Sequence, residues 1–181
     1  IIMLPYSKTC EEVQTFVDYV DGRCKTCLLL ETPEAVEIID DILEIKGIDE
    51  IHIGLNDLHL GYKMKFMFEL LADGTVEYLC NKFKHKNITY GFGGIAALGQ
   101  GTLPAENIIK EHYRLGSSMV ILSRSFCNTS QITDLNEIDV IFKEGVGAIR
   151  DFEKEVNDHL AYFEDNRQLV KQIVKQIVDG K

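Results

Sequence analysis

Short apolar runs alternate with stretches of helical periodicity along the first two thirds of the chain. The runs are rich in β-branched residues and leucine, and the helical stretches begin at recognisable caps, such as the capping box from Thr9 to Glu12. Thr32 is expected to cap a helix from Pro33 to Gly47, and Gly116 to end a later one. The five runs span residues 1–5, 26–30, 51–54, 88–92 and 118–123. Because strands that alternate with helices pair in parallel through right-handed crossovers, this pattern predicts an α/β fold.

Two parallel architectures fit this alternation, an open doubly wound sheet and a (β/α)8 TIM barrel. No glycine-rich phosphate-binding turn follows the early strands, which disfavours the doubly wound sheet. A complete barrel takes about 250 residues, and the 181 residues here hold too few strands to close one. We therefore predict part of a barrel in residues 1–128, followed by a C-terminal helical extension in residues 129–181 that packs on the sheet or on a partner subunit.

Composition narrows the classes of partner. The chain has 29 acidic and 19 basic side chains, a net charge of −10, so nucleic acid and anionic membrane surfaces are poor partners. No apolar run approaches the length of about 18 residues that a membrane helix needs, and the first residues lack the basic region of a signal peptide. With five cysteines, an odd number at irregular spacing, reduced thiols and a cytoplasmic location are expected.

Two acidic residues fall at the carboxyl ends of neighbouring predicted strands. Glu31 follows the second run, and Asp57 lies just after the third, behind Gly54 and Asn56. Neighbouring strands lie about 4.8 Å apart, so both carboxylates can bind one cation at the rim where barrels hold their active sites. A pair of oxygen ligands favours Mg²⁺ or Mn²⁺, with water and substrate as further ligands. The alternative is that both acids merely cap helices, and the spacing alone leaves the two interpretations open.

A second group of residues at the same rim is a candidate anion site. Gly93 and Gly94 follow the fourth run, and Ser123 and Arg124 follow the fifth. Barrels often bind phosphate after these strands, although glycines at strand ends also serve as tight turns. His52, between two isoleucines of the third run, is interpreted as a packed or hydrogen-bonded side chain rather than a ligand.

Two segments resemble a known family. Residues 28–36, Leu-Leu-Leu-Glu-Thr-Pro-Glu-Ala-Val, and residues 47–58, which contain Gly-Leu-Asn-Asp-Leu, closely resemble the HpcH/HpaI aldolase and citrate lyase β-subunit family. The separation of 26 residues between Glu31 and Asp57 (57 − 31) fits the spacing of that family's two metal-binding acids. The opening residues 2–13 resemble its fourth strand and the next helix. The resemblance covers about residues 1–125 and implies strands four to eight of the barrel.

The resemblance implies a metal-dependent lyase that breaks a carbon–carbon bond of a 2-oxo acid, such as a 4-hydroxy-2-oxo acid, through the enolate of pyruvate. Glu31 and Asp57 would be the ligands of Mg²⁺ or Mn²⁺. The backbone N–H groups of Asn56 and Asp57 would bind the substrate carboxylate, and Gly54 would allow close approach. Terminal helices of this family pack on neighbouring subunits, and an incomplete barrel leaves sheet edges uncovered, so a homo-oligomer is expected.

The sequence departs from the family in ways that define the alternatives. The family's carbonyl-polarising arginine and acid–base histidine lie on strands before the segment matched here. A non-catalytic barrel fragment, or a metal-binding assembly protein, is therefore the rival interpretation. A third, an isomerase or another phosphate-binding barrel enzyme, predicts an anion at Gly93 and Ser125. Leu29 and Leu55 replace a glutamine and a proline of many relatives, so substrate contacts should differ.

Overall fold

The computed structural model describes residues 1–157 and 162–180. Its four strands form one parallel sheet in the order β1-β2-β3-β4. The strands are β1 (Ile2–Leu4), β2 (Thr26–Leu30), β3 (Glu50–Ile53) and β4 (Thr89–Phe92). Each strand pairs with the next one along the chain, without the reversal of strand order that marks a doubly wound sheet. The topology is consistent with part of a TIM barrel, and the described strands form an open sheet rather than a closed one.

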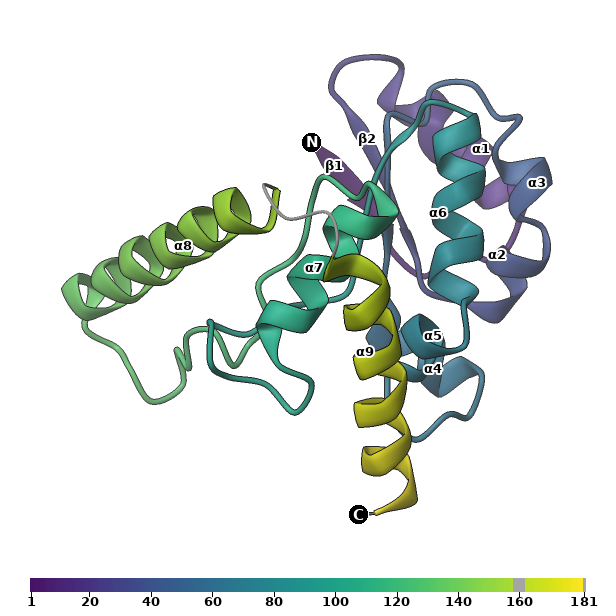
Figure 1. Cartoon of the computed structure of the whole chain (residues 1–181). Helices are drawn as coiled ribbons and strands as arrows, with labels where there is room; N and C mark the ends of the chain where they lie inside the picture. The colour runs from purple at the N-terminus through teal and green to yellow at the C-terminus, as the bar shows by residue number, and fades with distance from the viewer. Residues whose placement is uncertain (158–161, 181) are drawn as a thin grey trace.

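Helices follow the strands as the periodicity predicted. They are α1 (Cys10–Val20), α2 (Pro33–Glu37), α3 (Ile39–Ile42), α4 (Leu55–Gly61), α5 (Glu69–Ala72), α6 (Thr75–His85), α7 (Ala105–Leu115), α8 (Leu135–Asn157) and α9 (Tyr162–Asp179). The Thr9 hydroxyl accepts the N–H of Glu12, and the Glu12 carboxylate accepts the N–H of Thr9, which confirms the capping box. In Figure 1, α1, α2, α3 and α6 lie on one side of the sheet, and α8 lies on the other.

The second helix is not continuous, contrary to the expected helix from Pro33 to Gly47. Thr32 caps it through the N–H of Ala35, as predicted, but Ile38 leaves the helical conformation with φ −106° and ψ 19°. After this break, the side chains of Ile39 and Ile42 are both fully buried. Burial of these two side chains in the hydrophobic core therefore takes precedence over helix continuity here.

The fifth apolar run, residues 118–123, does not form the predicted continuous strand. It makes two isolated parallel bridges to the β4 side, Gly91 to Met119 and Ile95 to Leu122. Four steps along one side (95 − 91) oppose three along the other (122 − 119), so the register slips by one residue. Gly93 has a φ of +78°, outside the extended region, and this bend accounts for the slip.

Side chains alternate between the two faces of the sheet. Leu28, Leu30, Ile51, Ile53 and Phe92 are buried in the core under the helices. The opposite face carries Leu29, His52 and Gly91, which are aligned across β2, β3 and β4. This second face, at the carboxyl ends of the strands, leads to the site described below.

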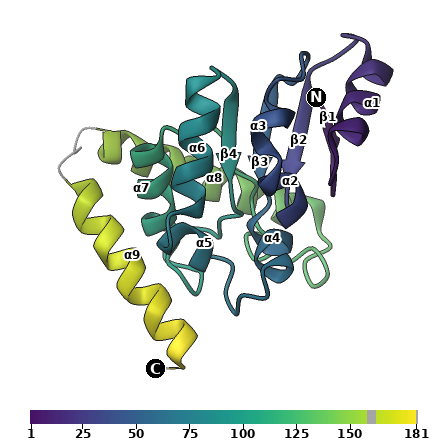
Figure 2. The ribbon, with the colours of Figure 1, turned by 90° about the vertical axis from the view of Figure 1, so that its right-hand side faces the viewer.

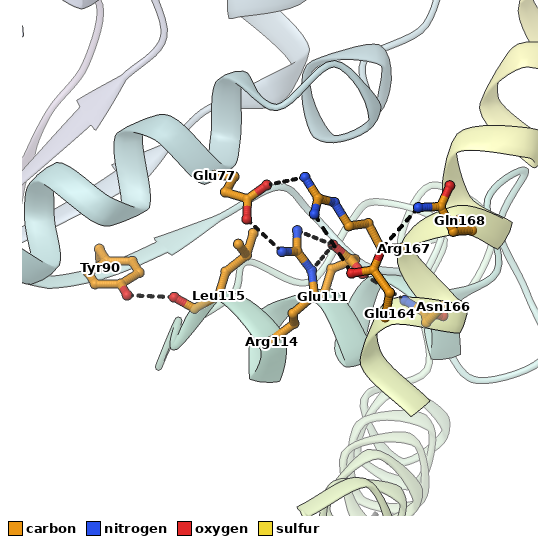
Figure 3. A network of polar contacts seen from close by, with 9 residues as sticks. All are labelled: Glu77, Tyr90, Glu111, Arg114, Leu115, Glu164, Asn166, Arg167 and Gln168. Carbon is orange, nitrogen blue, oxygen red and sulfur yellow. Dashed lines mark hydrogen bonds and ion pairs between the residues drawn. The ribbon is translucent and has the colours of Figure 1, made fainter. Parts of the chain in front are cut away.

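Part of the predicted C-terminal extension packs on the chain itself. Helix α9 contacts α5 and α7, and Figure 2 shows it running beside α7. Figure 3 shows the polar network that fixes it: Glu77 of α6 bridges Arg114 and Arg167, each at 2.8 Å. The amide nitrogen of Asn166 donates to Glu111 at 2.9 Å. Charged and amide side chains thus tie α9 to α6 and α7.

Across the described parts of the chain, none of the helices is both apolar and long enough to cross a bilayer. Residues 158–161 and Lys181, which belong to the predicted extension, lie outside the described residues.

Candidate functional site

One cavity of about 540 Å³ brings the predicted site residues together at the carboxyl end of the sheet. The predicted residues that line it are Glu31, Gly54, Asn56, Asp57, Gly93, Gly94, Ser123 and Arg124. Five further residues, Leu29, His52, Leu55, Met67 and Ile121, complete the wall. The candidate metal ligands and the candidate anion site are therefore parts of a single cavity rather than two separate sites.

Glu31 directly follows β2, and its carboxylate is held by the loop after β1. The side chain is buried, with 6% of the residue exposed, and its Oε1 atom accepts the backbone N–H of Tyr6 at 2.9 Å. Burial raises the pKa of Glu31, the hydrogen bond from Tyr6 opposes the rise, and the charge of Asp57 adds to it. A cation bound beside this carboxylate would stabilise its charged form and so offset the effects of burial and of Asp57.

Gly54 makes room for the Glu31 side chain. A Cβ atom at residue 54 would lie 2.8 Å from both the Cβ and the Oε2 of Glu31, closer than such atoms pack. The glycine between β3 and α4 is therefore required for the observed position of the carboxylate. Close approach was expected here for a substrate, and the structure shows it for Glu31.

Asp57 and Asn56 lie in the first turn of α4, and both are exposed. Asp57 lines the main cavity together with Glu31, and both also line a smaller opening beside Tyr6 and Lys8. Asp57 is thus accessible from solvent, whereas Glu31 is buried in the wall of the same site. Capping does not account for Glu31, because Thr32, not Glu31, caps α2.

The two carboxylates form a small donor set. No third aspartate, glutamate, histidine or cysteine joins them to form a metal-binding group within residues 1–157 and 162–180. Oxygen donors of this kind suit a hard dication such as Mg²⁺ or Mn²⁺, which commonly keeps several water ligands and takes others from substrate. Glu31 and Asp57 fit such an ion if water and substrate complete its coordination.

The cavity is also lined by a positively charged side chain, Arg124. Arg124 is exposed, and no carboxylate of the described residues pairs with it. The hydroxyls of Ser123 and Ser125 lie 2.7 Å apart beside it. The backbone of Gly93 lies in the left-handed region, which glycine adopts without strain. A glycine is therefore favoured here by the turn as well as by the space that it leaves in the cavity. Arg124 is the group in this cavity that can attract a negatively charged substrate.

His52 is the site residue that the sequence interpretation missed. It is 2% exposed, lines the cavity, and neither ring nitrogen has a hydrogen-bond partner among the described residues. Burial lowers its pKa to about 4, so the ring is neutral at pH 7. Of the two predicted alternatives, a packed or a hydrogen-bonded side chain, the described residues show the packed one. A polar residue between two core isoleucines was the signal in the sequence.

Comparisons with known proteins give the fold a precedent. A crystal structure of an HpcH/HpaI aldolase/citrate lyase family protein from Burkholderia cenocepacia J2315 matches with a TM-score of 0.55 and 13% sequence identity. The match covers 76% of this chain and 64% of that protein, so the chain spans less than two thirds of its relative's length. No family model matches the sequence, and no curated protein matches it. At this identity the likeness shows a shared fold.

Proposed function

We propose that this protein is a metal-dependent carbon–carbon lyase of the aldolase type, acting on a 2-oxo acid such as a 4-hydroxy-2-oxo acid. The observation that carries the proposal is the convergence of Glu31 and Asp57 on one cavity at the carboxyl end of a parallel sheet. Active sites of barrel enzymes lie at this end. The fold likeness to an aldolase/citrate lyase family protein adds support.

The side chains of the cavity divide the work of such a reaction. Glu31 and Asp57 would hold Mg²⁺ or Mn²⁺, and the ion supplies a Lewis acid for the negative charge that develops on the 2-oxo group. The backbone N–H groups of Asn56 and Asp57 would orient the substrate carboxylate, with Gly54 keeping Glu31 in place. Arg124, which lines the same cavity, would attract the anionic substrate.

The electrostatics of Glu31 predict how cation binding depends on pH. Because burial and Asp57 raise the pKa of Glu31, a proton competes with the cation for this carboxylate. Cation affinity should therefore increase as the pH rises through that raised pKa. The net charge of −10 also favours a cation over an anionic macromolecule as a partner.

The assembly state is a further part of the proposal. Edge strand β1 exposes apolar side chains, with 48% of Ile2 and 42% of Met3 accessible. A strand edge of this kind favours contact with another chain, so we propose a homo-oligomer. Light scattering of the purified protein tests this directly, and a monomer at micromolar concentration would contradict it.

Calorimetry with Mn²⁺ and an assay for pyruvate release from 4-hydroxy-2-oxopentanoate test the function together. We expect Glu31→Gln and Asp57→Asn to lose Mn²⁺ binding and turnover. Asp41→Asn, which removes an exposed carboxylate on α3, is the matched control and should retain both. Metal binding without turnover would support the rival, a non-catalytic metal-binding protein. No binding of Mn²⁺ or Mg²⁺ would exclude the proposed function.

A further inference from the structure

The cavity has a polar group on its inner wall that the proposed chemistry does not use. His52 lines the cavity, is almost fully buried, and has two ring nitrogens without a partner in the described part of the chain. Its neighbours in the sheet explain this: Leu29 is apolar and Gly91 has no side chain. Buried polar atoms in folded proteins are nearly always hydrogen-bonded, so His52 calls for a partner inside the cavity.

The position of His52 along β3 determines how far into the cavity a bound molecule must extend to contact it. It is two residues before Gly54, whose Cβ position touches Glu31, so it lies about 6.6 Å deeper along the strand than the carboxylate level. A molecule held by Glu31 and Asp57 must therefore extend inward to meet it. A chain of about six atoms, joined by five bonds with a rise of about 1.3 Å each, spans this distance.

The residues around His52 indicate which chemical group of a ligand could bind it. A neutral imidazole offers one N–H donor and one acceptor nitrogen, and a hydroxyl group can pair with either nitrogen because it both donates and accepts. Leu29, which is paired with it in the sheet, and Met67, which also lines the cavity, are apolar, and this disfavours a charged group at this depth. Arg124, in contrast, can meet charge nearer the opening.

We propose that His52 binds a hydroxyl group on the substrate's carbon chain, beyond the 2-oxo acid end held at Glu31 and Asp57. The inference rests on the proposed function and adds a residue that selects hydroxylated 2-oxo acids over their deoxy counterparts. The selection follows because a ligand without the hydroxyl leaves unpaired the ring nitrogen that the hydroxyl would have met in the filled cavity.

Two probes that differ only in the hydroxyl test this. We would measure the Kd of 5-hydroxy-2-oxopentanoate and of 2-oxopentanoate by calorimetry with saturating Mn²⁺. Neither has a hydroxyl on C4, so neither undergoes aldol cleavage during the titration. The protein should bind the hydroxylated probe about tenfold more tightly, and His52→Leu should abolish the preference while leaving the affinity for 2-oxopentanoate nearly unchanged.

His112→Leu is the matched control. His112 is also buried, and its Nε2 atom also lacks a partner within the described residues, but it does not line this cavity. The control should keep the tenfold preference. If His52→Leu does not fold, the ¹⁵N chemical shifts of the His52 ring in the unmodified protein provide the test. They should change when 5-hydroxy-2-oxopentanoate is added and should not change when 2-oxopentanoate is added.

The outcomes separate the inference from the function on which it rests. Equal affinities of the unmodified protein for both probes, as when water satisfies His52, would overturn the inference alone. A preference that survives in His52→Leu would do the same. If 2-oxopentanoate does not bind at all in the presence of Mn²⁺, the proposed function is wrong and the inference is lost with it.

Discussion

A buried histidine outside the cavity makes the stability of this protein depend on pH. His112 of α7 stacks on Phe92 with ring centroids 3.8 Å apart and an angle of 2° between the planes. Its Nδ1 lies 2.7 Å from the Ser117 hydroxyl, and its Nε2 has no partner in the described residues. Among the described residues, no carboxylate forms a hydrogen bond or ion pair with the ring. Burial, and next the neighbouring His52, lower the pKa of His112 from 6.5 to about 3.

The sign of the effect follows from proton linkage. The folded protein keeps His112 neutral, whereas the unfolded chain binds a proton below pH 6.5. The contribution to stability is therefore fully present above pH 6.5 and is lost as the pH falls from 6.5 towards 3. At pH 5, which is about 1.5 units below the pKa of the histidine in the unfolded chain, protonation stabilises the unfolded state by about 2 kcal/mol.

Urea unfolding at pH 8 and pH 5 measures this loss. We compare the unmodified protein with His112→Phe, which keeps an aromatic ring against Phe92, and with His85→Phe, a control at an exposed position. Between the two pH values, His112→Phe should lose about 2 kcal/mol less stability than the unmodified protein, or about 1 M in urea midpoint. Carboxylates titrate equally in all three proteins, so the difference isolates His112. Equal losses in His112→Phe and the unmodified protein would refute the reasoning.

Three substitutions test other parts of the structure. Gly91→Ala places a Cβ atom 2.0 Å from the carbonyl oxygen of Met119, so we expect a loss of about 3 kcal/mol in urea unfolding; unchanged stability would show that residues 118–123 do not bridge to β4. Gly54→Ala displaces the Glu31 carboxylate and should weaken Mn²⁺ binding about 10- to 100-fold in calorimetry, and an unchanged Kd would exclude Glu31 as a ligand. Asn166→Ala removes three hydrogen bonds between α9 and α7 and should cost about 3 kcal/mol; hydrogen exchange that leaves α9 as protected as before would contradict this.

Several helix ends, and the placement of the two acidic residues, could be predicted from the sequence alone. The capping box at Thr9, the Thr32 cap followed by Pro33, and the Gly116 end of α7 are all where the pattern predicted them. Such signals act over three or four residues, so they need no tertiary context. The placement of Glu31 and Asp57 at one end of the sheet also followed, because parallel strands point their carboxyl ends the same way.

Other features depended on contacts between distant segments. The break at Ile38, the slipped bridges of residues 118–123 and the docking of α9 through Glu77 each depend on which surfaces meet in the folded chain. His52 shows the reason most clearly. Its alternation with isoleucines placed it on one face, but whether a partner faces it depends on Leu29 and Gly91, 23 and 39 residues away (52 − 29 and 91 − 52). Pairing of this kind arises only when strands are aligned, and so only the tertiary structure decided it.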